Sequence, residues 1–347
     1  MIFVDRIFSQ LNVYDSLQQR LNMLLLTGAT GFVGNAVLKQ LMQQADVAIR
    51  TYGRRAPVEV DTARVADASA KIISHMTGEI SAAADYTPAL VDVDVVIHCA
   101  AQAHVMNNSV NNEVDIYRDI NVDSTLHLAR QAITAGVKRF IFISSIKVNG
   151  ESTIYSQTFT HDCAAAPEDA YGRSKQAAED GLRQLVANSG MELVIIRPPL
   201  VYGPGVKGNF SSLLAIAKKN LPLPLGAINN QRSMVALANL VHLIIICVHH
   251  PQAANQTFLV SDDQDISTTQ LLEIMTRATG KSPWLLPVPM SWLRLLGRVT
   301  GKQAVIERLC GNLLVDISHT KAILGWKPPI SVEEGIKRCF IEDKNAC

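Results

Sequence analysis

The chain has 347 residues, enough for one large α/β domain and a smaller second lobe. Its 32 Lys and Arg nearly balance its 31 Asp and Glu, which gives no sign of a nucleic-acid partner. The six cysteines form no C-x-x-C pair and have no metal-ligand spacing, so we expect a reducing compartment and no metal site.

No strongly apolar run approaches the roughly 20 residues that a membrane-spanning helix needs. Residues 1–22 carry charged and polar residues and no small-residue cleavage site, unlike a secretory signal. We therefore expect a cytoplasmic protein without membrane insertion, and we treat residues 1–22 as an N-terminal extension of unassigned function.

Apolar strand-like runs alternate with helical segments over the first 200 residues. The expected strands are Met23 to Thr27, Asp46 to Tyr52, Lys71 to Ser74, Val93 to Cys99, Arg139 to Ser144 and Leu193 to Arg197. Helical periodicity covers about Asp115 to Ala135 and Tyr171 to about Asn188. This alternation predicts an α/β fold, with a Rossmann-type doubly wound parallel sheet.

The regular alternation fades after Gly205, where prolines become frequent, and this predicts a smaller C-terminal α/β substrate lobe. We expect an NAD(P)-binding domain over 23–200, with returning segments at about 232–262. The substrate-binding lobe is expected over about 201–231 and 263–340.

Gly28, Gly31 and Gly34 follow the first expected strand with the spacing G-x-x-G-x-x-G. In such a strand–turn–helix the glycines permit a tight turn, approach to a pyrophosphate and close helix packing, while the helix N-terminus faces the phosphate charge. An ordinary glycine-rich turn has the same pattern, so the motif gains weight only with a second one.

The second motif is Tyr171 and Lys175, four residues apart on one face of an expected helix. A tyrosine has a reference pKa of about 10, and a neighbouring lysine ammonium favours its phenolate. Ser145, which ends the fifth strand region, can hydrogen-bond the same substrate oxygen. We expect Ser145, Tyr171 and Lys175 to form a proton-transfer site; the alternative for Y-x-x-x-K alone is a solvated helix face.

The glycine motif and the Ser145, Tyr171 and Lys175 set occur together with several further segments. Taken together, these residues resemble those of the extended short-chain dehydrogenases/reductases of the nucleotide-sugar epimerase/dehydratase type. The resemblance extends from Met23 to about Phe340. Those segments are Gly78-Glu-Ile80, His98-Cys-Ala-Ala101, Asn121, Ser144-Ser145, Arg197 to Pro204, Gln231-Arg-Ser233, Asp316-Ile-Ser318 and Leu324-Gly-Trp326.

The resemblance implies a nicotinamide dinucleotide cofactor and a UDP-sugar substrate. The residues it assigns to the cofactor are Gly28, Thr30, Gly31, Phe32, Val33 and Gly34 at the diphosphate, Glu79 and Ile80 at the adenine, and Ala100, Ala101, Asn121, Tyr171, Lys175 and Pro198 elsewhere along it. NAD-preferring members carry an acidic residue after the second strand, where this chain has Arg54 and Arg55. A guanidinium suits a 2′-phosphate, so NADP(H) is favoured and NAD(H) is the alternative; two exposed surface arginines would have the same sequence.

The reaction type follows from a departure from the dehydratases, which have an acidic pair after the active-site Ser/Thr. Here no carboxylate follows Ser145 until Glu151, which argues against dehydration. This leaves reduction of a 4-keto sugar or epimerisation at C4. The segments Ser144 to Glu151, Gln102 to Met106 and Gln231 to Val235 resemble a subgroup of bacterial surface-polysaccharide enzymes. That resemblance implies the leading hypothesis, reduction of the C4 ketone of a UDP-4-keto-6-deoxy-N-acetylhexosamine for surface-polysaccharide or O-antigen synthesis. The alternative is a UDP-hexose or UDP-N-acetylhexosamine 4-epimerase with tightly bound NAD. A non-catalytic nucleotide sensor is disfavoured because the chain keeps both Tyr171 and Lys175.

The resemblance also implies substrate contacts and an assembly. The implied substrate-binding residues are His104, Lys147, Asn149, Asn209, Arg232 and Arg308. Three of them have a simpler alternative. Lys147 could be only a charged loop residue, His104 a capping or packing residue at a helix start, and Arg308 part of a surface salt bridge. Family members commonly pair two helices per subunit, which implies a homodimer through a four-helix bundle built from about Asp115 to Ala135 and Tyr171 to Asn188.

Overall fold

A computed structural model describes residues 23–44, 47–60, 73–103, 110–154 and 157–341. The described residues fall into two compact units. The first lies within residues 1–144, 173–196 and 244–256, and the second within residues 145–172, 197–243 and 257–347. The N-terminal extension lies outside the described residues, and the expected domain boundaries remain a prediction.

The main sheet confirms the expected Rossmann-type fold. Its strand order is β3-β2-β1-β4-β5-β6-β9. The strands are β1 (Leu24–Thr27), β2 (Ile49–Gly53), β3 (Ile73–Thr77), β4 (Val95–His98), β5 (Arg139–Ile143), β6 (Glu192–Arg197) and β9 (Gln256–Leu259). The pairs from β3 to β6 are parallel, with Leu24 opposite both Ile49 and Val95. The order reverses around β1 and β4, where ligands of doubly wound sheets bind.

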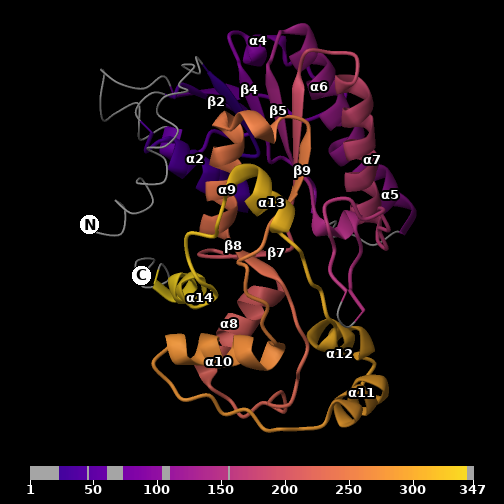
Figure 1. The fold of residues 1–347 in the computed structure, drawn as a ribbon, viewed down its shortest axis with the longest axis vertical. Coiled ribbons are helices and arrows are strands. Elements are labelled where there is room, and N and C mark those ends of the chain that lie inside the picture. The colour runs from indigo at the N-terminus through magenta and orange to yellow at the C-terminus, as the bar shows by residue number, and fades with distance from the viewer. Residues whose placement is uncertain (1–22, 45–46, 61–72, 104–109, 155–156, 342–347) are drawn as a thin grey trace. The chain divides into compact units, whose positions relative to one another are not determined.

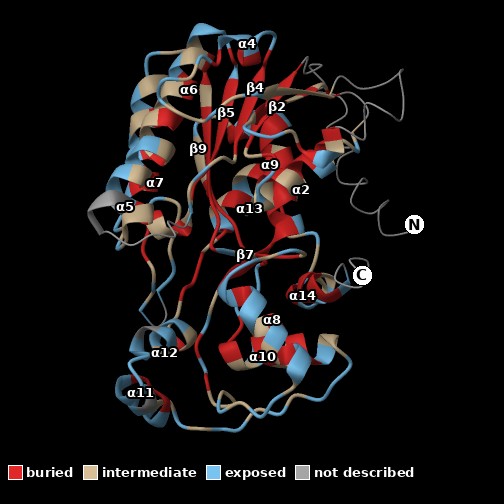
Figure 2. Cartoon of the chain, turned by 180° about the vertical axis from the view of Figure 1, so that it is seen from behind, coloured by how far each residue is buried: buried red, intermediate tan, exposed pale blue. Residues whose placement is uncertain are grey.

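Helices flank this sheet within the first unit (Figure 1). They are α2 (Phe32–Leu41), α4 (Thr87–Leu90), α5 (Val110–Tyr117), a π-helix (Arg118–Asp123), α6 (Ser124–Thr134), α7 (Ala170–Val186) and α9 (Leu237–His249), the last two continuing into the second unit. The central strands β1, β4 and β5 are buried, as Figure 2 shows, and Leu25, Val96, Phe140 and Leu182 lie in one apolar cluster. Strands covered on both faces are expected to be continuously apolar, which is why most were recognisable in the sequence.

Strand β3 differs from its expected position. The apolar start of Lys71 to Ser74 suggested a strand that ended at Ser74, but the observed strand runs from Ile73 to Thr77. It pairs with β2 alone among the described strands and is only half-buried, so polar residues such as Ser74 and His75 are tolerated inside it.

The second unit has its own core. Its elements are β7 (Leu200–Tyr202), β8 (Met234–Ala236), α8 (Asn209–Lys219), α10 (Thr268–Ala278), α11 (Met290–Val299), α12 (Gln303–Cys310), α13 (Ser318–Leu324) and α14 (Val332–Ile341). Tyr202, Phe210, Met275 and Ile336 pack together in its centre. No helix in the described part of the chain is both long and apolar enough to cross a bilayer.

Candidate active site

The glycine motif forms a tight turn between β1 and α2. Gly28 has φ +71°, and a Cβ at this position would lie 2.6 Å from the backbone nitrogen of Ala100. A side chain is therefore excluded by backbone conformation and by the close approach of the chain that follows β4. A Cβ at Gly34 would collide with the carbonyl oxygen of Gly28, so the helix can pack here only on a glycine.

Helix α2 presents its N-terminus at the carboxyl end of β1. Gly31 is its N-cap residue and has no side chain to satisfy the first backbone N–H groups. Thr30 and Gly31 are exposed, while Phe32 and Val33 are half-buried. Unsatisfied N–H groups and the positive end of the helix dipole fit a diphosphate. The turn therefore fits the dinucleotide that the sequence predicts.

A buried histidine joins the strands that carry this turn. His98 Nδ1 lies 2.8 Å from Thr27 Oγ1, and its Nε2 lies 3.0 Å from Thr125 Oγ1 of α6. Complete burial, with a smaller contribution from Lys175, lowers the pKa of His98 to about 3. The neutral ring thus connects β1, β4 and α6 beneath the turn.

The other expected cofactor residues of the first unit follow the ends of its strands. Arg54 and Arg55 come directly after β2 and are both exposed. Glu79 is exposed and Ile80 half-buried after β3. Ala100 and Ala101 follow β4. All of these lie at the carboxyl edge of the sheet, as the ligand-binding rule for parallel sheets requires.

Asn121 fastens the segment after β4 to helix α7. It is 1% exposed and lies in the π-helix Arg118–Asp123. Its Nδ2 donates to the carbonyl of Gln102 and to Ser174 Oγ, each at 3.0 Å, and its Oδ1 accepts from the Gln102 backbone at 2.8 Å. Asn121 therefore positions the residue that precedes Lys175.

Lys175 is almost fully buried, with 2% of its surface exposed. Its Nζ donates to the carbonyl of Ile143 at 2.9 Å and lies 4.5 Å from the centre of the Phe142 ring. Burial lowers the pKa of Lys175 to about 8, although Cys99 and Glu179 oppose the shift. An ammonium held in so dry a position interacts strongly with any oxyanion nearby.

Glu179 is a residue of this region that the sequence analysis missed. It is fully buried, and its Oε1 accepts from Ser144 Oγ at 2.6 Å, while its Oε2 accepts from Arg183 at 3.0 Å. It fixes Ser144, the residue before Ser145. The available signal was its place four residues after Lys175, on the same helix face.

In the second unit, the loop after Ser145 packs on the start of α7. Ser145 Oγ accepts from the backbone N–H of Lys147 at 3.2 Å and begins a short 3₁₀ turn, Ile146–Val148. A Cβ at Gly172 would lie 2.7 Å from the carbonyl oxygen of Lys147. The structure thus brings the loop of Ser145 against the helical turn that carries Tyr171.

Lys147 has protein partners in this loop. Its Nζ lies 2.8 Å from Glu151 Oε1 and 2.5 Å from Asp169 Oδ2, and the two hydrogen bonds raise its pKa against the opposing effect of burial. Asp169 also accepts from the backbone N–H of Gly172 at 2.6 Å, so it caps the first turn of α7. Asp169 was not recognised in the sequence, although Asp is a common capping residue.

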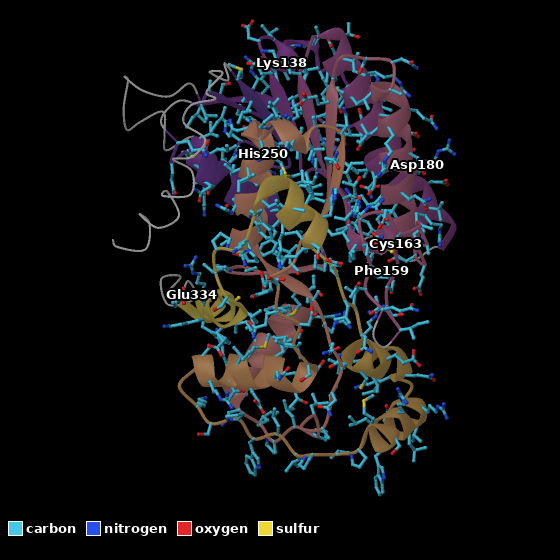
Figure 3. The ribbon with its side chains drawn as sticks, viewed as in Figure 1. Lys138, Phe159, Cys163, Asp180, His250 and Glu334 are labelled. Carbon is cyan, nitrogen blue, oxygen red and sulfur yellow. The ribbon has the colours of Figure 1, made fainter. Side chains whose placement is uncertain are left out.

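The segment between this loop and α7 is held by the C-terminal part of the second unit. Phe159 donates its backbone N–H to Leu314 at 2.8 Å, and its carbonyl accepts from Asp316 at 2.9 Å. Thr160, which follows Phe159, donates its backbone N–H to Cys163 Sγ at 3.3 Å, and Figure 3 labels Phe159 and Cys163 on this segment. Asn149 is 2% exposed and its Oδ1 accepts from Arg197 at 3.0 Å. Pro198 is buried and accepts from the backbone of Ile146 at 2.9 Å.

The expected substrate residues of the second unit fall into two groups. Arg232 is partly buried and donates to the carbonyls of Arg308 at 2.9 Å and Gly311 at 3.2 Å, which places it beside the end of α12. Arg308 is exposed in α12. Asn209 is exposed at the start of α8, and His104 lies outside the described residues. No group of three described His, Cys, Asp or Glu side chains is placed to hold a metal ion.

Comparison with known proteins places this geometry in a family. The model of the NAD dependent epimerase/dehydratase family matches residues 24–261. The chain is 48% identical over 326 residues to a UDP-glucose 4-epimerase of Vibrio cholerae, covering 93% of this chain and 96% of that protein. It is 27% identical, over 90% of this chain and 93% of the relative, to an N-acetyl-alpha-D-glucosaminyl-diphospho-ditrans,octacis-undecaprenol 4-epimerase of Escherichia coli O157:H7.

Solved structures share the fold at lower identity. UDP-glucuronic acid 4-epimerase of Bacillus cereus, in complex with NAD, has a TM-score of 0.73 at 18% identity and covers 93% of this chain and 99% of its own. UDP-glucose 4-epimerase of Thermotoga maritima, with UDP-glucose, has a TM-score of 0.71 at 21% identity over 93% and 99%. From the family match and the Vibrio relative together, we conclude that the chain belongs to the NAD dependent epimerase/dehydratase family of enzymes.

Proposed function

We propose that this enzyme interconverts the C4 epimers of a UDP-hexose or UDP-N-acetylhexosamine, with NAD retained between turnovers. The observation that carries the proposal is the 48% identity, over 93% of the chain, to a UDP-glucose 4-epimerase. This reaction is the alternative indicated by the sequence, and the relatives favour it over the leading hypothesis, the 4-reductase.

The residues of the site support an oxidation and re-reduction at C4. A bound nicotinamide supplies a hydride acceptor and donor. Tyr171 takes the proton of the C4 hydroxyl while the hydride leaves C4, and it returns the proton when the opposite face of the ketone is reduced. Lys175, one turn along α7, stabilises the phenolate of Tyr171, and Ser145 donates a hydrogen bond to the C4 oxygen.

The substrate's diphosphate is assigned to Arg232 and Arg308, which lie close together in the second unit. Desolvation lowers the pKa of Arg232, yet the guanidinium keeps its charge at neutral pH because its reference pKa exceeds 12. Buried cations that face a diphosphate bind it more strongly than exposed ones. Asn209 is assigned to the nucleotide half, and His104, Lys147 and Asn149 to the sugar, as the family resemblance implies.

One observation favours a second candidate, reduction of a UDP-4-keto-6-deoxy-N-acetylhexosamine with NADPH. Arg54 and Arg55 are both exposed directly after β2, where a 2′-phosphate would be recognised. A reductase exchanges its cofactor in every turnover, whereas an epimerase retains it.

The deciding experiment incubates the purified enzyme with UDP-glucose, UDP-N-acetylglucosamine and the 4-keto sugar in separate reactions. Formation of the C4 epimer without added nucleotide, together with NAD released on denaturation, would support the epimerase. Stoichiometric loss of NADPH with the keto sugar, and no epimer from either UDP-sugar, would replace it by the reductase.

The assembly is also a proposal. A homodimer through a four-helix bundle would pair the 110–134 region and α7 of each subunit. In the first unit these helices already pack closely, since a Cβ at Gly181 would lie 2.7 Å from Leu126. Light scattering on the purified protein measures the mass, and a monomer at micromolar concentration would contradict the proposal.

A further inference from the structure

Helices α11 and α12 of the second unit form a close pair (Figure 1). A Cβ at Gly297 of α11 would lie 2.9 Å from Ile306 of α12, so the two helices touch at a glycine. Leu293 is 3% exposed and packs with Ile228 and Cys310. One face of α11, with Leu293 and Gly297 four residues apart, is therefore the face that the fold uses.

A different face of α11 carries large apolar side chains in solvent. Trp292 is 70% exposed, Leu295 61% and Val299 78%. Their spacing of three and four residues puts these side chains along one stripe of an α-helix. Since each residue turns the helix by about 100°, this stripe lies about 100° or more around the axis from Leu293. Figure 2 shows the exposed residues of this helix. These three side chains do not belong to the apolar cluster that Leu293 joins.

Other large apolar side chains are exposed at nearby positions of the sequence. Trp284 is 58% exposed and Leu286 45% exposed on the strand-like segment before α11, and Val305 is 52% exposed on α12. Two of the three tryptophans of the chain thus face solvent, whereas Trp326 is buried. Large exposed apolar patches mark interaction sites with other proteins or with membranes.

The charge near this stripe is mainly positive, although α12 carries one exposed carboxylate, Glu307. Residues 274–306 contain no Asp or Glu and five Lys or Arg. Arg294 and Arg298 lie one turn apart on α11 and are exposed beside the stripe, and Lys302 follows the helix and is also exposed. The chain as a whole has nearly equal numbers of acidic and basic residues, so the absence of acid over these 33 residues is local.

We propose that the exposed face of α11, formed by Trp292, Leu295 and Val299 with Arg294 and Arg298 beside it, binds the surface of an anionic lipid bilayer. A helix of 10 residues is about 15 Å long, so it lies in the headgroup region and does not span the bilayer. Trp and Leu on one side and Arg on the adjacent side are typical of interfacial helices, and the basic residues complement the anionic headgroups.

The same charges argue against a second copy of this chain on that face. A twofold dimer places identical patches against each other, so Arg294 and Arg298 would face the same arginines of the partner. Glu307 of α12, which accepts from Gln303, supplies only one exposed carboxylate against these two arginines in each copy. Like charges that meet in an interface are unfavourable.

The test is flotation of the full-length protein with vesicles of phosphatidylglycerol and phosphatidylcholine, against vesicles of phosphatidylcholine alone. We expect binding to the anionic vesicles, weakened by salt, together with a blue shift of the tryptophan emission. Trp292→Ser with Leu295→Ser should lower the partition coefficient about tenfold or more. Arg294→Gln with Arg298→Gln should lower it about fivefold for each charge removed.

Matched controls separate the surface from general effects. Val91→Ser removes an exposed valine of the first unit, and Arg130→Gln with Lys207→Gln removes two exposed charges elsewhere. These variants should bind as the wild type does, and thermal melting should show every variant folded. The proposal is overturned if the wild type does not bind anionic vesicles at low salt. It is equally overturned if the α11 variants bind unchanged, or if they alter the oligomeric mass instead of vesicle binding.

Discussion

Lys147 Nζ lies 2.5 Å from one carboxylate oxygen of Asp169, while the other oxygen of Asp169 caps the first turn of α7. The ion pair therefore joins the loop of Ser145 to the helix turn that carries Tyr171. Both partners are partly buried, and the contacts to Lys147 and Gly172 lower the pKa of Asp169 against the opposing effect of its burial. From these contacts we expect Lys147 to position Ser145 and Tyr171, the two groups proposed to hold the C4 oxygen, in place of the sugar contact that the family resemblance implies.

Lys147→Met should lower kcat about tenfold to hundredfold with little change in KM, because small misplacements of reacting groups are costly. Lys147→Arg keeps the charge and should retain most of the activity. Steady-state kinetics with the UDP-sugar substrate measures both values, and Lys207→Met serves as a matched control with an exposed lysine. A raised KM with unchanged kcat would show that Lys147 contacts the sugar, as the sequence predicts.

Tyr171→Phe should reduce turnover by about 10³-fold, since the variant has no group that exchanges the proton of the C4 hydroxyl. Dinucleotide binding, measured by titration calorimetry, should change little. Tyr117→Phe removes the hydroxyl of a buried tyrosine, at 3.4 Å from the carbonyl of Ala103, and should leave turnover nearly intact. Substantial activity in Tyr171→Phe would disprove the proton-transfer assignment.

Lys175→Met should abolish activity and yet stabilise the fold at pH 7. The pKa of Lys175 falls from 10.5 to about 8 in the folded protein, a difference that corresponds to about 3 kcal/mol. Between these two pKa values the unfolded chain binds more protons than the folded protein, so the stability of the wild type rises with pH across that window. Below pH 8 the full cost of burying the charged Lys175 reduces the stability of the folded protein.

Lys175→Met also loses the hydrogen bond to the carbonyl of Ile143, which reduces the gain in stability. We therefore expect the variant to be about 1–2 kcal/mol more stable than the wild type at pH 7, and this gain should disappear towards pH 10.5. Denaturant unfolding at pH 7 and pH 10 measures the difference. A gain that does not depend on pH would show that another interaction of Lys175 dominates.

The role of the two exposed arginines after β2 in cofactor preference can be tested by substitution. Arg54→Ala with Arg55→Ala should weaken NADP(H) binding at least about tenfold if either guanidinium binds the 2′-phosphate, and should leave NAD(H) binding unchanged. Arg130→Ala, another exposed arginine of the first unit, is the control. Equal effects on both dinucleotides would mean that the arginines act only as general surface charge.

Gly28→Ala should destabilise the fold by about 3 kcal/mol or more, because the new Cβ meets the backbone of Ala100 in addition to the strain of a positive φ. Gly136 has a similar φ of +79° but open space around its Cβ position, so Gly136→Ala should cost only about 1–2 kcal/mol. Chemical denaturation compares the two. Similar losses in both variants would show that the approach of Ala100 can relax.

The sequence predicts the sheet well because a strand buried on both faces needs an unbroken apolar run. β1, β4 and β5 each lie within two residues of their expected bounds. β3 was displaced because a half-buried strand admits Ser74 and His75, and local pattern then no longer marks its end. β9 was not expected as a strand. It lies beside β6, which ends more than fifty residues earlier in the chain, and a local sequence pattern does not indicate so distant a pairing.

The sequence marks candidate site residues where the proposed role depends on neighbours in the chain, and their catalytic roles stay predictions. Gly28 and the Tyr171–Lys175 pair are cases of this kind. Glu179 and Asp169 were missed because their partners, Ser144 and Lys147, lie 35 and 22 positions away. Only the folded chain shows that a carboxylate on a helix, ordinarily a solvent-facing charge, is buried against the end of a strand.

The π-helix around Asn121 makes the exact length of the chain part of the fold. Its six residues, Arg118–Asp123, form a wider turn between α5 and α6. Deleting one residue there would remove the wider turn and change the direction of the side chains within it, Asn121 among them. Asn121 would then point away from Gln102 and Ser174, although every side chain of the site would still be encoded. Insertions and deletions in this turn should therefore be tolerated less well than substitutions at its exposed positions.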